Sequence, residues 1–126
     1  MDLVDTNIFL EILFQQNKSP DCEHYLRTHY GKLYFSTFSL HSIGVLLFKK
    51  KQVALFDKFL KDFPPGTLML PISNNGYSQL SSVQSKYNLD YDDSFQFQVA
   101  SENNLRLVTM DMDFKKTVSD IQVMFL

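Results

Sequence analysis

The sequence predicts a three-layer α/β/α sandwich around a central, mostly parallel five-stranded sheet. Three observations lead to this prediction: short apolar runs alternate with longer amphipathic segments, the length of 126 residues fits one domain, and the composition is that of a globular protein. Parallel strands need crossover connections, and helical crossovers cover both faces of a sheet. We therefore expect a single domain that spans residues 1–126.

The order of the expected elements follows from apolar periodicity and from turn residues. Thr6 or Asn7 is expected to cap the first helix and Ser73 the fifth, while residues 88–93 are expected to form a loop. Strands are predicted at residues 3–5, 32–37, 67–71, 105–109 and 121–125, and helices at about 8–13, 20–30, 39–51, 52–63, 74–86 and 94–103.

Composition excludes several classes of function. The net charge of −2 argues against a protein that coats nucleic acid through bulk positive charge, and Lys49 to Lys51 are expected to be a solvated helix face. Cys22 is the only cysteine, so the chain can form neither an internal disulfide nor a cysteine-based zinc site. No apolar run approaches the roughly 20 residues of a membrane helix. With Asp2 and Asp5 close to the start, a signal peptide is not expected, and we predict a cytoplasmic protein.

Acidic residues stand at the expected ends of two strands. Asp5 ends the first strand, Asp111 follows the fourth, and Asp92 and Asp93 open the helix that leads into the fourth. If these two strands are neighbours in the sheet, their carboxyl ends share one crevice, which is where α/β sheets bind ligands. Like charges gathered there are costly unless a cation or protonation relieves them, so the pattern favours a divalent metal site.

Each acid also has a purely structural interpretation. Asp92 or Asp93 could cap a helix and complement its dipole, and Asp113 could cap the short turn at residues 114–116. Asp5 is harder to explain in this way, because a charge at the end of an apolar strand is expensive without a partner. The three locations together favour the metal site.

The motifs "LVDTNIFLE", "FSTFSLHSIG" and "DYDDSFQFQVASENNLRLVTMDMDF" resemble those of the PIN domain, the nuclease fold of VapC-type toxins. The resemblance covers essentially the whole chain, in the expected order. It assigns the metal-binding Asp of the first strand to Asp5, followed by Thr6 and Asn7. It assigns the third acid to Asp93, with Asp92 as a close alternative. The family's final motif matches four residues: Thr109, Asp111, Asp113 and Phe114.

One position departs from the family pattern. The family usually carries a Glu in the helix after the second strand, and the matching stretch "STFSLHS" places Ser42 there. A hydroxyl can hold a water but brings no charge, so the change predicts weaker metal affinity.

The resemblance implies a metal-dependent endoribonuclease of the kind that acts as the toxin of a toxin–antitoxin pair. Asp5, Asp93 and Asp111, with Asp113 nearby, would hold Mg²⁺ or Mn²⁺, the ions that oxygen ligands suit. Thr109 and Asn7 would orient ligands or water, and Tyr91 and Phe38, placed near the expected mouth of the site, could stack on RNA bases. A homodimer and a cognate antitoxin are implied in the same way.

Two other hypotheses remain open on the residues. The first is a PIN-like module that binds RNA or a protein partner without efficient catalysis, and Ser42 is its best support. The second is a metal-dependent phosphatase, which is disfavoured because Asn7 stands where a second Asp would be wanted two positions after Asp5.

Overall fold

Five strands form one sheet in the order β3-β2-β1-β4-β5, and every pair in it is parallel. The computed structural model describes residues 1–126. The strands are β1 (Asp2–Val4), β2 (Leu33–Ser36), β3 (Leu68–Leu70), β4 (Arg106–Thr109) and β5 (Val123–Phe125). The helices are α1 (Thr6–Leu13), α2 (Ser19–Thr28), α3 (Thr37–Lys49), α4 (Val53–Lys61), α5 (Asn74–Tyr87) and α6 (Tyr91–Glu102), with a 3₁₀ helix, η1 (Met112–Thr117), before β5. No helix has the length and apolar character needed to cross a membrane.

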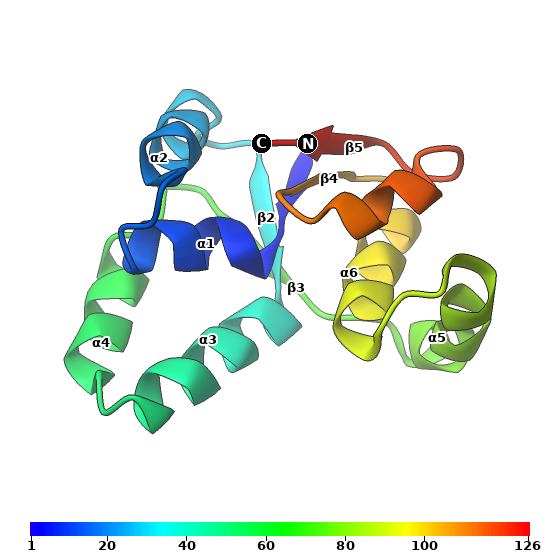
Figure 1. Cartoon of the computed structure of the whole chain (residues 1–126), viewed down its shortest axis with the longest axis horizontal. Coiled ribbons are helices and arrows are strands. Elements are labelled where there is room, and N and C mark those ends of the chain that lie inside the picture. Colours follow the sequence, from blue (N-terminus) through cyan, green and yellow to red (C-terminus); the bar gives the residue numbers. More distant parts are fainter.

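The sheet separates two hydrophobic cores, which confirms the three-layer prediction. Helices α1 to α4 lie on one side of it, and α5 and α6 lie on the other (Figure 1). Successive strand residues point to opposite faces, so Leu3 joins the core under α5 and α6 while Val4 joins the core under the first four helices. Leu107 and Val108 divide in the same way on β4.

The order of the strands places β1 beside β4. The predicted convergence of Asp5 and Asp111 depends on this neighbourhood. Val4 pairs with Val108, and the backbone N–H of Asp5 donates to the Val108 carbonyl at 2.9 Å. From β1 the chain moves to β2 and β3 on one side, whereas β4 and β5 lie on the other. The carboxyl ends of β1 and β4 therefore meet at the point where the direction of winding reverses.

At two of the helices whose predicted start was wrong by a few residues, the correction involves an acid. Helix α1 is capped by Asp5, whose Oδ1 accepts from the Thr6 N–H at 2.8 Å, rather than by Thr6 or Asn7. Helix α6 begins at Tyr91 instead of Ser94 because Asp90 caps it, accepting from the Asp93 N–H at 2.9 Å. Asp92 and Asp93 thus lie in the first helical turn, not in a loop, and neither is the cap.

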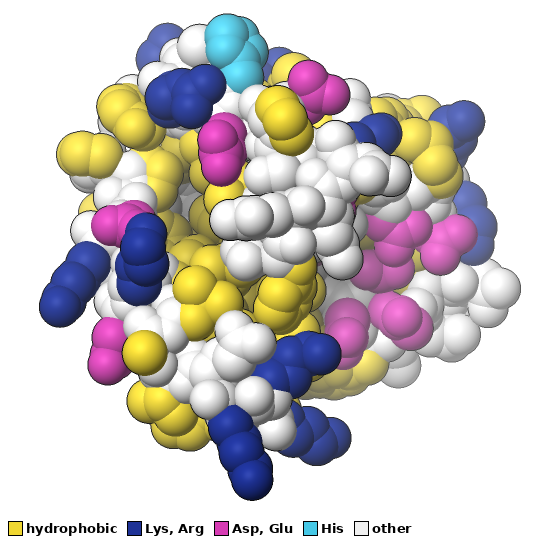
Figure 2. Space-filling model, turned by 60° about the vertical axis from the view of Figure 1, so that its left-hand side comes forward, with side chains coloured by type: hydrophobic (Ala, Val, Ile, Leu, Met, Phe, Trp, Pro, Cys, Tyr) yellow, Lys and Arg dark blue, Asp and Glu magenta, His cyan; other side chains and the backbone are white.

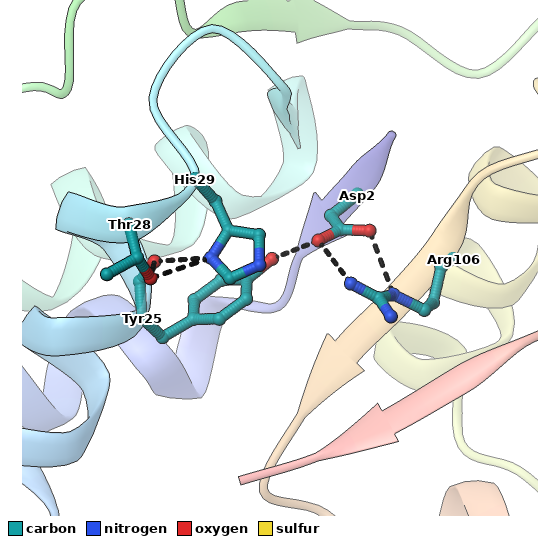
Figure 3. Close-up of polar contacts among 5 residues, drawn as sticks. All are labelled: Asp2, Tyr25, Thr28, His29 and Arg106. Atoms are coloured by element: carbon teal, nitrogen blue, oxygen red, sulfur yellow. Dashed lines mark hydrogen bonds and ion pairs between the residues drawn. The ribbon is translucent and has the colours of Figure 1, made fainter.

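A buried polar group closes the amino end of β1. Figure 3 shows Asp2 between Tyr25 and Arg106, with His29 stacked on the tyrosine. Arg106 donates to both oxygens of Asp2 at 2.9 Å, and the Tyr25 hydroxyl donates to Oδ2. Burial acts to raise the pKa of Asp2, but the hydrogen bonds from Arg106 and Tyr25 outweigh it and lower that pKa. This acid is ionised and paired, and it fixes α2 against β1 and β4.

Removing the guanidinium from this group should destabilise the fold. Arg106→Met leaves the Asp2 carboxylate, whose side chain is 4% exposed, without its cation. We expect a loss of about 3 kcal/mol in the free energy of unfolding, measured with urea. Arg27→Met is the matched control, because its pair with Glu23 is exposed, and it should change stability by less than about 0.5 kcal/mol. Equal effects of the two variants would contradict a structural role for the Asp2 pair.

Candidate metal centre

Three carboxylates converge at the carboxyl ends of β1 and β4. If one carboxylate oxygen is taken from each of Asp93, Asp111 and Asp113, these three atoms lie within 4.8 Å of one another. Asp93 comes from the first turn of α6, and the other two follow β4. Acidic side chains gather on the right of the face drawn in Figure 2. Asp93 and Asp111 thus lie near each other, as the prediction of converging acids requires.

No basic side chain neutralises this cluster. The ion pairs of the protein join Arg27 to Glu23, Lys58 to Asp62, Lys86 to Asp120 and Arg106 to Asp2, and none includes a cluster acid. Partial burial and the charges of Asp90, Asp111 and Asp5 raise the pKa of Asp93 to about 8. The site therefore binds a proton far more tightly than an isolated carboxyl does, and a divalent cation would relieve the same repulsion.

Asp5 lies beside the cluster, held by neutral donors. It is 5% exposed, and its carboxylate accepts from the Thr6 N–H at 2.8 Å, Gln96 Nε2 at 3.0 Å and Thr109 Oγ1 at 2.7 Å. Burial raises its pKa and the charge of Asp111 adds to this, while the three hydrogen bonds act in the opposite direction. Asp5 is outside the group of mutually close oxygens, but its charge contributes to the raised pKa of Asp93.

Thr109 and Asn7 link Asp5 to Asp111. The Thr109 hydroxyl donates to Asp5 and accepts from the Asp111 N–H at 3.0 Å and from Asn7 Nδ2 at 3.3 Å. Asn7 Oδ1 in turn accepts from the Met110 N–H at 3.3 Å. These contacts fix the chain directly after β4, so the position of Asp111 depends on both predicted supporting residues.

The structure also places three further residues that the sequence singled out. Asp111, not Asp113, caps η1, because its Oδ1 accepts from the Asp113 N–H at 2.9 Å. Asp92 is exposed and lies outside the cluster. Ser42 is half-buried on α3, and its hydroxyl makes no hydrogen bond with any of the acids.

Sequence reasoning missed two residues of the hydrogen-bond network around Asp5, Gln96 and Ser39. Gln96 is 1% exposed, and its side chain contacts Asp5, Ser36 and Ser39. The available signal was a Gln between Phe95 and Phe97 in the most deeply buried helix, where a polar side chain needs buried partners. Ser39, one turn before Ser42 on α3, is the α3 hydroxyl that joins this network.

The donor set fits a hard divalent cation. All the side-chain atoms that converge are carboxylate oxygens, and two of the three cluster acids are partly buried. Oxygen-only sites with several carboxylates suit Mg²⁺ or Mn²⁺ rather than zinc or copper. Asp93, Asp111 and Asp113 present this donor set directly, and Asp5 supplies a fourth carboxylate next to it.

The sheet is all-parallel, helices cover both of its faces, and acids lie where the direction of winding reverses. These features define an α/β protein with an acidic site lined by carboxylate oxygens. Residues 3–119 match the model of the PIN domain, and the chain belongs to this family. Comparison with curated protein sequences gives no match.

Solved structures share the fold at low sequence identity. VapBC2 of Rickettsia felis, bound to a promoter DNA fragment, is 18% identical over 98% of this chain and 97% of that chain, with a TM-score of 0.79. VapC20 of Mycobacterium tuberculosis, a sarcin–ricin loop cleaving toxin, is 11% identical over 93% and 95%, with a TM-score of 0.78. A toxin–antitoxin complex of Klebsiella pneumoniae is 21% identical over 90% of both chains, with a TM-score of 0.72. The likeness establishes the fold.

The crowding of acids predicts an unusual dependence of stability on pH. Because the pKa of Asp93 rises from an ordinary 3.8 to about 8 on folding, its protonation stabilises the metal-free protein. This contribution is fully present below about pH 3.8 and is lost as the pH rises toward 8. With a chelator present, Asp93→Asn should therefore gain stability relative to the natural chain between pH 5 and pH 9, measured by urea unfolding. A difference between the two proteins that does not change with pH would contradict the crowded cluster.

Proposed function

We propose that this chain is a divalent-metal-dependent endoribonuclease, the toxin of a toxin–antitoxin pair. The observation that carries the proposal is the cluster of Asp93, Asp111 and Asp113 at the carboxyl ends of β1 and β4, next to buried Asp5 and without a basic partner. Membership of the PIN domain family supports a nuclease, and the toxins among the structural neighbours support the biological setting.

The roles of the residues follow from their placement. Asp5, Asp93, Asp111 and Asp113 would hold Mg²⁺ or Mn²⁺, which when bound would supply Lewis-acid activation of water and phosphate. Thr109 holds Asp5 Oδ2 and the backbone of Asp111 through one hydroxyl, and Asn7 holds that hydroxyl in turn. Asp92, exposed in the same helical turn as Asp93, would face the substrate rather than the ion.

The surface near the cluster suits single-stranded RNA. Tyr91, two residues before Asp93, is 56% exposed and packs edge-on against Phe38 with the ring centroids 6.3 Å apart. An exposed aromatic ring can stack on an unpaired base. Lys115 is exposed on η1, close in sequence to Asp113, and makes no ion pair, so it is free to contact a phosphate.

Two protein partners belong to the same proposal. An apolar pocket of about 290 Å³ between α1, α2 and α4, lined by Phe9, Leu13, Phe59 and others, would accept an apolar segment of an antitoxin. The exposed apolar side chains of Val45, Phe48 and Met69 on α3 and the edge strand β3 would be covered in a homodimer. Burial of such apolar surface is the usual driving force for association.

A binding module without catalysis is the second candidate. It is favoured by Ser42, which brings no charge to the acids. Such a module would bind RNA or a protein partner but would hold metal weakly.

Removing a carboxylate from the cluster should separate the two candidates. Asp5→Asn and Asp111→Asn should each lower Mn²⁺-dependent RNA cleavage by on the order of 100-fold or more, since loss of an outer partner of a metal ligand alone costs about 10- to 100-fold. Calorimetric titration of Mn²⁺ should show the same loss of binding. Asp57→Asn, an exposed acid on α4, is the matched control and should behave like the natural chain. No Mn²⁺ binding and no cleavage by the natural, folded chain would reject the nuclease in favour of the binding module.

A further inference from the structure

Gln96 is a deeply buried polar side chain that hydrogen-bonds to Asp5. It lies on α6, one turn after Asp93, and is 1% exposed. Its Oε1 accepts from Ser36 Oγ at 2.7 Å, and its Nε2 donates to Asp5 Oδ1 at 3.0 Å and to Ser39 Oγ at 2.9 Å. One amide therefore joins α6, the end of β2, the start of α3 and the end of β1.

The chemistry of its neighbours fixes the orientation of the Gln96 amide. An ionised carboxylate only accepts hydrogen bonds, so the NH₂ group must face Asp5 and the carbonyl must face Ser36. The Ser36 hydroxyl can donate, and it does so. A flipped amide would set two acceptors against each other in a buried site, which is costly.

This arrangement leaves the two oxygens of Asp5 unequal. Oδ1 accepts two hydrogen bonds, from the Thr6 N–H and from Gln96, whereas Oδ2 accepts one, from Thr109. A carboxylate oxygen has about two lone-pair sites, so Oδ1 is saturated and Oδ2 keeps one acceptor site free.

We propose that Gln96 is a positioning residue that saturates Oδ1 of Asp5 and so makes Oδ2 the single oxygen that this acid offers to a divalent ion. The proposal rests on the proposed function, because it takes Asp5 as a ligand. In this arrangement α3 contributes Ser39, a neutral acceptor for Gln96, and the carboxylate of Asp5 is held by amide, hydroxyl and backbone donors.

A purely structural role for Gln96 makes a different prediction. If the amide only satisfies Ser36 and Ser39, its loss lowers the stability of the metal-free and metal-bound protein equally. If it positions Asp5, its loss also reduces the stabilisation that the ion itself provides, which depends on affinity for the folded state.

Gln96→Met tests this difference, because it keeps the approximate volume and removes the donor. Mn²⁺ affinity is measured by calorimetry on the folded full-length chain, and the unfolding temperature is measured with and without saturating Mn²⁺. We expect at least about tenfold weaker Mn²⁺ binding and a smaller rise in unfolding temperature on adding Mn²⁺. Gln98→Met is the matched control on the same helix, because the Gln98 side chain hydrogen-bonds to Glu102 and not to Asp5, and it should leave both quantities unchanged.

Ser36→Ala is the second variant, and it decides the matter if Gln96→Met does not fold. It removes the donor that anchors Gln96 Oε1 and, with it, the α3 cap that accepts from the Ser39 N–H, and it should weaken Mn²⁺ binding by about threefold to tenfold. Natural affinity for Mn²⁺ in a folded Gln96→Met or, failing that, Ser36→Ala protein would overturn the positioning role while leaving the proposed function intact. Absence of Mn²⁺ binding by the natural chain would overturn the proposed function, and the positioning role with it.

Discussion

The electrostatic repulsion between carboxylates at the ends of β1 and β4 is the constraint on which the rest of the site depends. Hydrophobic burial sets the strand order and so brings Asp5 next to Thr109 and Asp111, while α6 delivers Asp93 to the same place. None of these acids has a cationic partner, and the pKa of Asp93 rises to about 8 through burial and its acidic neighbours. Folding energy thus holds together charges that would separate in water, and a divalent cation is the ligand that such a site favours.

The two buried acids of the first strand segment show how environment sets their roles. Asp2 and Asp5 are three residues apart and almost equally buried. Asp2 receives a bidentate guanidinium and a phenol, which lower its pKa and make it a structural anchor. Asp5 receives only neutral donors, and burial raises its pKa. The charge of Asp5 is therefore oriented but not neutralised, which is what a ligand for a cation requires.

Hydrophobic patterning was sufficient to predict the sheet and the gathering of the acids, because short apolar runs flanked by helical periods leave few possible topologies. The family motif gave the likeness to PIN domains. The start of α6 was misplaced because Asp90, Asp92 and Asp93 are all acceptable caps, and only the geometry of the turn selects Asp90. Gln96 was missed because a Gln in a helix is expected to face solvent, and its burial depends on Ser36 and Asp5, which are remote in the sequence.

Diffraction at the manganese absorption edge from crystals of the natural chain soaked in Mn²⁺ is the most direct test of a divalent metal site at these acids. We expect an anomalous peak in contact with carboxylate oxygens of Asp93 and Asp111, with Oδ2 rather than Oδ1 of Asp5 as the oxygen turned toward it. Asp111→Asn crystals treated identically should lose the peak. A natural chain without a peak at millimolar Mn²⁺, or with manganese bound only elsewhere on the surface, would contradict the account.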